Sequence, residues 1–350
     1  MEHLFQQITE EEYRQLPHIS YSKISKFISG GPASLIKKQD SEKTNNMLLG
    51  NLFDTLLTEP NKISEKYFIG ETSLTDKQIK IIQNIRQDSL PEDTELIKLF
   101  NKFEFYSTYT DKTRLVKFLT NETDIINYLK ACKTNENLYY ISKSEFNFVS
   151  EKVTLLKTHP FTKDIFDNDL CELFFQAKVV SNDLSAKCMF DLVVIDHVHQ
   201  VIFPIDFKFM EDSARTFMRS FERFNYYIQD TLYTDVLDYE LKKLKLDYTI
   251  MEMTFIVVSQ KDNIILQYVP EIDVLNENEV AVNNRIKKSW QYYLNEIKWH
   301  LGYQIFDYTR EEYENKGIIC IPSTKTNLTT NYTDYETLTT TDFPKDDLPF

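Results

Sequence analysis

Three stretches in the middle of the chain decide the fold: CELFFQAKVV (171–180), AKCMFDLVVI (186–195) and QVIFPIDFKF (200–209). Each is rich in aromatic and β-branched residues, and the polar segments SNDLS and DHVHQ separate them. Short apolar runs bounded by polar turns are typical of strands that follow one another as a meander. The sequence therefore predicts three adjacent strands at the centre of a sheet.

Further elements follow these strands toward the C-terminus. The segment EDSARTFMRSFERFNYYIQDTLYTDVLDYELKKL (211–244) predicts one long helix, and residues 248–260 and 263–272 predict two more strands around a Lys-Asp-Asn turn. A last helix is expected over 275–300. Strands combined with long helices in this way indicate an α/β fold, in which helices flank a central sheet.

The segments before the sheet have a helical pattern. Residues 20–28 and 47–60 carry apolar side chains at helical spacing, and a further helix, 143–159, ends where Pro160 interrupts the pattern. The end of the chain is rich in Thr, Asn and Asp and lacks periodicity, which indicates a flexible polar tail. The predicted parts are a helical N-terminal part of the main domain (1–60), a helical insertion or cap (61–142), the core of that domain (143–321) and the tail (322–350).

The glycine and cysteine content argues against several function classes. The 350 residues include six glycines, and none of their spacings matches a dinucleotide-binding G-x-G-x-x-G, a P-loop or a G-x-S-x-G elbow. Dinucleotide enzymes, P-loop ATPases and ordinary serine hydrolases are therefore not expected. The four cysteines, at positions 132, 171, 188 and 320, are scattered, which argues against a disulfide framework, a zinc knuckle or a cysteine-ligated cluster.

Charge and hydropathy bear on location and partners. No apolar run approaches the roughly 18 residues of a membrane span, and the acidic, polar start MEHLFQQITEEEY is unlike a signal peptide. We expect a cytoplasmic protein with no membrane partner. The formal net charge of −14 argues against nonspecific coating of nucleic acid. It is compatible with an enzyme of nucleic acids, which needs only a local basic track and a metal at its reaction centre.

Four charged side chains occupy strand positions where the fold alone does not require them. Glu172 begins the first predicted strand, Asp191 lies within the second, and Asp206 and Lys208 lie two residues apart in the third. Side chains alternate across a strand, so Asp206 and Lys208 are expected on one face and the intervening Phe207 on the other. Asp191 is expected within cross-strand reach of this pair.

Neighbouring carboxylates repel each other unless a cation lies between them. Mg²⁺, or Mn²⁺ in its place, is a hard ion that takes oxygen ligands from carboxylates, backbone carbonyls and water. A lysine at the same edge can orient a metal-bound water and stabilise the charge of a phosphoryl transition state. This pattern predicts metal-assisted hydrolysis of phosphodiesters; the alternative is an exposed sheet face with a surface Asp/Lys pair.

A stripe of polar and aromatic residues follows on the predicted helix 211–244. Arginine forks suit phosphates, and aromatic and amide groups suit sugars, base edges or backbone. The stripe therefore predicts contacts with DNA. In the alternative interpretation the tyrosines pack under the sheet and the arginines are solvated. The members, at helical spacing, are Arg215, Arg219, Tyr226, Gln229 and Tyr233.

Taken together, Asp191, the triplet Asp206-Phe207-Lys208 and the pair Gln229-x-x-x-Tyr233 resemble the PD-(D/E)xK nuclease superfamily. The resemblance is closer to its exodeoxyribonuclease VIII (RecE-like) branch and to phage and RecB-type relatives, which have Q-x-x-x-Y after D-x-K. Three further segments are similar to that branch, in order along the chain: ISYSKISKFISGGPASL (19–35), LLGNLFDTLLTEP (48–60) and KTHPFTKDIFDNDLCELFF (157–175).

The resemblance implies a restriction-endonuclease-like fold, with a mixed central sheet flanked by helices and helical N-terminal additions. It also implies that Asp191, Asp206 and the backbone carbonyl of Phe207 bind the metal and that Lys208 is the catalytic lysine. Glu172 would be an accessory ligand or hold a second metal. Asp54 stands where relatives have a histidine; aspartate is a harder metal ligand than imidazole, so the metal preference can differ.

The same resemblance implies a phage-type exonuclease of recombination or repair. Gln229 and Tyr233 would contact DNA or brace the site. The implied partners are the ends of linear duplex DNA, a single-strand annealing protein and further copies of the chain. Two alternatives remain open: a catalytically silent DNA-binding or assembly protein that keeps the fold, and a metal-dependent endonuclease.

Overall fold

The computed structural model describes residues 3–37, 44–87 and 89–319. Two compact units divide the chain between Asp307 and Tyr308. In the second unit the described residues include one short helix, α14 (Arg310–Glu314). The predicted polar tail, 322–350, lies outside the described residues. No helix within the described ranges has both the length and the apolar character needed to cross a membrane.

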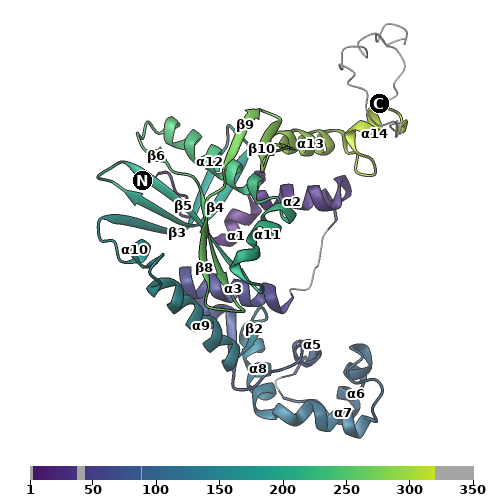
Figure 1. The fold of residues 1–350 in the computed structure, drawn as a ribbon. Coiled ribbons are helices and arrows are strands. Elements are labelled where there is room, and N and C mark those ends of the chain that lie inside the picture. The colour runs from purple at the N-terminus through teal and green to yellow at the C-terminus, as the bar shows by residue number, and fades with distance from the viewer. Residues whose placement is uncertain (1–2, 38–43, 88, 320–350) are drawn as a thin grey trace. The chain divides into compact units, whose positions relative to one another are not determined.

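A mixed sheet of six strands forms the centre of the first unit (Figure 1). Its order is β3-β4-β5-β7-β8, with β6 paired to β5; the β5–β7 and β5–β6 pairs are parallel and the others antiparallel. The central mixed sheet with flanking helices confirms the α/β expectation, and the three meander strands begin and end within one residue of their predicted bounds. The strands are β3 (Cys171–Ser181), β4 (Ala186–Asp196), β5 (Val201–Met210), β6 (Thr249–Ile250), β7 (Thr254–Ser259) and β8 (Ile265–Tyr268).

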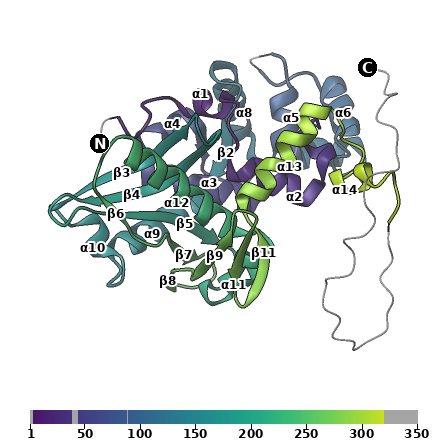
Figure 2. The ribbon, with the colours of Figure 1, turned by 90° about the horizontal axis from the view of Figure 1, so that it is seen from above.

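Helices cover both faces of this sheet (Figures 1 and 2). On one face, α2 (Tyr21–Gly30), α12 (Tyr226–Lys243) and α13 (Trp290–Tyr303) join the sheet in one hydrophobic core. On the other face, α3 (Asn45–Thr58) and α9 (Lys143–Thr158) form a second core with it. The helices predicted over 20–28, 47–60 and 143–159 are thereby confirmed as α2, α3 and α9.

Alternation along β5 places its charged residues as expected. Ile205 and Phe207 pack in the core of α3 and α9. Asp206 and Lys208 contact Gln229 of α12, on the opposite face. The predicted separation of the polar pair from its apolar neighbours is therefore confirmed.

The prediction of one helix over 211–244 is wrong. The chain forms a 3₁₀ turn, η4 (Ala214–Thr216), then α11 (Phe217–Arg223), and α12 begins only at Tyr226. The helices are separated at Asn225, which has a φ of 55° in the left-handed region. Asparagine tolerates this conformation better than most residues, so it can end one helix and begin another without a glycine.

The helix predicted over 275–300 is wrong in its first half. An antiparallel sheet of order β11-β10-β9 occupies this segment, and α13 begins at Trp290. Asn283 and Asn284 link two of the strands with φ values of 50° and 57°. Two consecutive left-handed residues match a tight hairpin turn, so the Asn-Asn dipeptide was the signal for this hairpin. The strands are β9 (Ile272–Asn276), β10 (Glu279–Val282) and β11 (Arg285–Lys288).

The segment between α3 and α9 has a hydrophobic cluster of its own, which includes Phe100, Phe118 and Tyr128. A parallel pair of short strands, β1 and β2, brings its two ends together. Its elements are η2 (Pro60–Lys62), α4 (Ile63–Lys66), β1 (Tyr67–Gly70), α5 (Asp76–Asn84), α6 (Asp93–Lys102), α7 (Asp111–Phe118), η3 (Leu119–Asn121), α8 (Glu122–Thr134) and β2 (Tyr139–Ser142). The remaining short helices are α1 (Glu10–Gln15), η1 (Pro32–Leu35) and α10 (Lys163–Phe166).

Candidate functional site

The residues of interest lie in one row across three strands. On β3 and β4, Phe175 pairs with Leu192 and Ala177 pairs with Phe190. Gln176 therefore lies directly opposite Asp191. The ladder between β4 and β5 ends at the pair Leu192–Ile205, and the next residues along the two strands are Asp191 and Asp206. Gln176, Asp191 and Asp206 are therefore neighbours from strand to strand, and together they are called the aspartate row.

Gln176 and Asp191 each mark a local distortion of the sheet. Gln176 has a φ of 51°, which side chains other than glycine rarely adopt inside a strand. On β4, Phe190 packs in the core of α12 whereas Leu192 packs in the core of α3 and α9. Residues two apart in a regular strand share a face, so the strand switches faces at Asp191.

Asp191 is tied to the neighbouring strand through its side chain. Its Oδ2 accepts a hydrogen bond from the backbone N–H of Phe207 at 2.8 Å. Burial raises the pKa of the Asp191 carboxyl well above its ordinary value, and the carboxylates of Asp206 and Asp54 raise it further. A nearby cation would offset both effects, because it favours the ionised form.

Asp206 is held by two polar side chains from the α12 face. Its side chain is buried, with 3% of the residue exposed, and its Oδ1 accepts a hydrogen bond from Nε2 of Gln229. Its Oδ2 forms an ion pair with Nζ of Lys208 but accepts no hydrogen bond of good geometry. Oδ2 of Asp206 thus faces the positive charge of Lys208 and can still accept a hydrogen bond or bind a metal ion.

The ammonium of Lys208 lies between this carboxylate and aromatic rings. Nζ is 4.4 Å from the ring centre of Tyr226 and 5.7 Å from that of Phe255, and it donates to Oε1 of Gln229 at 3.4 Å. Burial by itself lowers the pKa of Lys208, but Asp206, Tyr226 and Asp191 together outweigh burial, so the pKa lies above its ordinary value. Lys208 is therefore a fixed cation rather than a proton acceptor at neutral pH.

Asp54 approaches the row from α3. It lines a cavity of about 420 Å³ together with Asp191 and Gln176. Burial raises the pKa of Asp54 to about 7; Lys208 opposes this rise and Asp206 adds to it. The side chain expected at the position of the family histidine therefore shares a cavity with Asp191 and interacts electrostatically with both strand aspartates.

Glu172 does not lie with the aspartates, which corrects its prediction as an accessory ligand of this site. It pairs across the sheet with Ile195, four residues along β4 from Asp191, or about 13 Å at strand spacing. Its exposed carboxylate contacts Nε2 of His197 at 2.9 Å instead. Strand register, which the sequence pattern left open, decides this placement.

The predicted five-residue stripe is also corrected, because the break at Asn225 divides it. Tyr233 is 8% exposed and its ring lies edge-on to Phe190 at 5.0 Å, so it packs inside the core. Arg215 and Arg219 are exposed and lie before the break. Neither arginine contacts the aspartates in the part of the chain that the structure describes.

The two strand aspartates offer a small set of oxygen donors for a divalent ion. Within the described residues, no three or more histidine, cysteine, aspartate or glutamate side chains gather closely enough to form a metal site alone. Mg²⁺ commonly takes only one or two protein carboxylates and completes its shell with water and substrate oxygens. Asp191 and Asp206, with the unbonded Oδ2 of Asp206, fit that mode of binding.

One residue of the row was missed by the sequence analysis. Gln176 faces the same cavity as Asp54 and Asp191, and its backbone conformation is strained. The available signal was a polar side chain in the middle of the otherwise apolar run CELFFQAKVV. Strain of this kind is typical of functional sites, where the surroundings hold it in place.

Comparison with known proteins adds no family to this description. No model of a protein family matches the chain, and no curated protein matches it.

Proposed function

We propose that this chain is a metal-dependent deoxyribonuclease with a PD-(D/E)xK core, most active on the ends of linear duplex DNA. The observation that carries the proposal is the row in which Asp191 and Asp206 follow one another across two strands, with the Lys208 ammonium at Asp206. Two carboxylates that can share a metal ion, with a fixed cation beside them, suit metal-assisted hydrolysis of a phosphodiester.

Each residue has a separate task in this proposal. Asp191 and Asp206 would hold Mg²⁺, with Asp54 approaching from α3. The ion, when bound, supplies an activated water and neutralises phosphate charge. Lys208 would stabilise negative charge on the phosphate oxygens, because its high pKa keeps it charged throughout. Gln229 would keep Asp206 oriented through its amide N–H.

The preference for DNA ends rests on the resemblance of the sequence to RecE-like exonucleases. A role in recombination or repair, in the host cytoplasm when phage-encoded, follows from the same resemblance. A single-strand annealing protein and further copies of the chain are the partners it implies. These finer assignments are part of the proposal.

The decisive experiment compares three DNA substrates with Mg²⁺: a 5′-labelled linear duplex, a 3′-labelled linear duplex and a closed circle. We expect digestion of both linear substrates only, with the polarity read from the order in which label is released. Asp206→Asn and Lys208→Met should lower the rate by roughly 100-fold or more. Lys242→Met, on an exposed ion pair of α12, is the control and should retain the rate.

Two outcomes would remove the proposal or change it. Undiminished digestion by both variants would remove the mechanism. Cutting of the closed circle would make the protein an endonuclease that uses the same groups.

A second candidate function is a nuclease-like DNA-binding protein without activity. The enclosed setting of Asp206 favours it, because both carboxylate oxygens already face protein groups, Gln229 and Lys208. Calorimetric titration with Mn²⁺ separates the two candidates. A nuclease should bind Mn²⁺ and lose that binding in Asp206→Asn, whereas a silent protein should show no binding in either form.

A further inference from the structure

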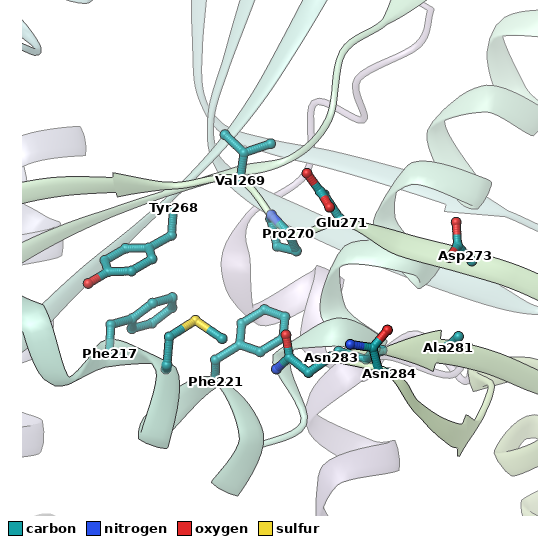
Figure 3. A pocket seen from close by; sticks show the side chains of 12 residues that line it. Phe217, Phe221, Tyr268, Val269, Pro270, Glu271, Asp273, Ala281, Asn283 and Asn284 are labelled. Carbon is teal, nitrogen blue, oxygen red and sulfur yellow. The ribbon is translucent and has the colours of Figure 1, made fainter.

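Two cavities lie beside β9 and share no lining residue with the cavity at the aspartate row. The first, of about 420 Å³, lies between the segment Tyr268–Asp273 and a wall of Phe217, Phe221 and the Asn283–Asn284 turn (Figure 3). The second, of about 750 Å³, shares the Val269–Asp273 segment with the first. The two cavities therefore adjoin the same segment, and together they are called the β9 groove.

The β9 groove is acidic. The residues that line it include no lysine, arginine or histidine. Among the described residues, Glu252, Glu271 and Asp273 form no ion pair. The groove thus presents carboxylates without internal neutralisation, beside apolar and aromatic side chains. Its acidic residues are Asp230, Asp235, Glu252, Glu271 and Asp273.

Strand β9 runs along this groove as an edge strand. It pairs with β10 on one side and is the last strand of its sheet. Edge strands have unpaired backbone N–H and C=O groups, which can accept a further strand. Val274 on this strand is 66% exposed, so the edge also offers apolar surface.

Side chains along this edge alternate between acidic and aliphatic. The order is Glu271, Ile272, Asp273, Val274. Ile272 and Val274 lie opposite the buried valines of β10, whereas Asp273 lies opposite Ala281. One face of the edge is therefore aliphatic and the other is negatively charged.

We propose that the β9 groove binds an extended segment of a partner protein in which basic residues alternate with apolar ones. Such a segment would add a strand to β9 and place its basic side chains beside Glu271 and Asp273. Its apolar side chains would meet Ile272 and Val274 and enter the cavities. The partner segment is thus defined by its charge, opposite to that of Glu271 and Asp273, and by its alternation of basic and apolar side chains.

Other occupants fit less well. Nucleic acid is disfavoured by charge, because its phosphates would face the exposed carboxylates of Glu252, Glu271 and Asp273. The chain's own residues 320–350 include two lysines and five acidic side chains, so they have the wrong charge. The proposal does not depend on nuclease activity, since it uses none of the residues of the aspartate row.

The experiment uses the full chain and fluorescein-labelled hexapeptides, read by fluorescence anisotropy. The probe is Lys-Leu-Lys-Phe-Lys-Leu. Three control peptides separate the contributions: Glu-Leu-Glu-Phe-Glu-Leu reverses the charge, Lys-Ser-Lys-Ser-Lys-Ser removes the apolar side chains, and Lys-Lys-Lys-Leu-Phe-Leu removes the alternation. We expect the probe to bind at least roughly tenfold more tightly than each control.

Charge-reversal variants locate the binding site. Asp273→Lys should weaken probe binding by roughly tenfold or more. Glu271→Lys is a second variant at the same edge, should the first fail to fold. Asp169→Lys, an exposed carboxylate outside the groove, is the matched control and should leave binding unchanged.

Four results would overturn the proposal. Equal binding of the serine-containing peptide would reduce the groove to a patch that attracts any polycation. Probe binding that survives both groove variants would place the site elsewhere. Competition by duplex DNA would favour nucleic acid. Concentration-dependent self-association that Asp273→Lys abolishes, measured by sedimentation, would identify a second copy of the chain as the occupant.

Discussion

The carboxylate of Asp191 accepts a hydrogen bond from the backbone N–H of Phe207 at 2.8 Å. The regular ladder between β4 and β5 has already ended one residue earlier, at Leu192 and Ile205. A side chain of one strand therefore continues the pairing that the main chain has stopped. This arrangement keeps the candidate ligand in place and gives it a structural task besides any chemistry.

The double role of Asp191 leads to different expectations for two substitutions. Asp191→Asn keeps an oxygen that can accept from the Phe207 N–H, and it removes a buried charge whose carboxyl pKa burial raises. At pH 8 its free energy of unfolding should equal or exceed that of the wild type. Asp191→Ala should lose about 1–3 kcal/mol, because the N–H is left unpaired. Urea unfolding measures both; equal losses would show that the hydrogen bond contributes nothing.

Divalent metal should stabilise the fold through the aspartate row. A ligand at a hundred times its dissociation constant adds about 2.7 kcal/mol to the free energy of unfolding. Mg²⁺ should therefore raise the melting temperature of the wild type, and a chelator should reverse the rise. Asp206→Asn should melt at the same temperature with and without Mg²⁺. An equal rise in this variant would place the bound metal outside the row.

Gln176 offers a test of stored strain. Its φ of 51° suits glycine, so Gln176→Gly should raise the free energy of unfolding by up to about 1 kcal/mol. Gln176→Val should lower it by about 1–3 kcal/mol, because a β-branched side chain resists this conformation. Digestion by the glycine variant should fall by roughly tenfold, since the carboxamide beside Asp191 is lost. An unchanged digestion rate in Gln176→Gly would show that neither the strain nor the carboxamide contributes to activity.

Asp230 on α12 predicts a pH dependence of stability. Burial raises the pKa of its carboxyl to about 7 in the folded protein, well above the value of an unfolded aspartate. The folded state therefore binds this proton more tightly, and stability falls as pH rises from about 4 to 7. Asp230→Asn should remove this loss, worth a few kcal/mol at pH 8, while the two proteins should converge near pH 4.

Unfolding in urea at a series of pH values checks the Asp230 prediction. Asp238→Asn is the control, because Asp238 forms an exposed ion pair with Lys242 on the same helix. A pH profile that is the same in Asp230→Asn and the wild type would contradict the prediction.

The part of the site on β5 could be predicted from the sequence for a simple physical reason. Alternation in a strand depends only on local geometry, so Asp206 and Lys208 had to share a face once the strand was recognised. The opposition of Asp191 to Asp206 followed from the short turn between their strands. Glu172 could not be placed in this way, because register decides which residue of β4 it meets.

Errors in the helical regions have a different origin. Asn225 adopts a left-handed conformation that propensity and hydrophobic spacing do not reveal, whereas the Asn283–Asn284 dipeptide was an available turn signal. Asparagine also occurs inside regular helices and strands, so a single asparagine carries little information about where a helix breaks. The division of the predicted stripe followed from one such residue, Asn225.

The enclosure of Lys208 has a consequence for work at different ionic strengths. Its ammonium lies between the Asp206 carboxylate and the rings of Tyr226 and Phe255, where dissolved counterions have little access. At physiological concentration, mobile ions screen interactions between exposed charges that lie more than about 8 Å apart, but they act weakly on buried pairs. Added salt should therefore weaken attraction by the exposed Arg215 and Arg219 and leave the Asp206–Lys208 pair unscreened. Raising the ionic strength should therefore weaken binding of a polyanion more than it slows the reaction of the bound polyanion.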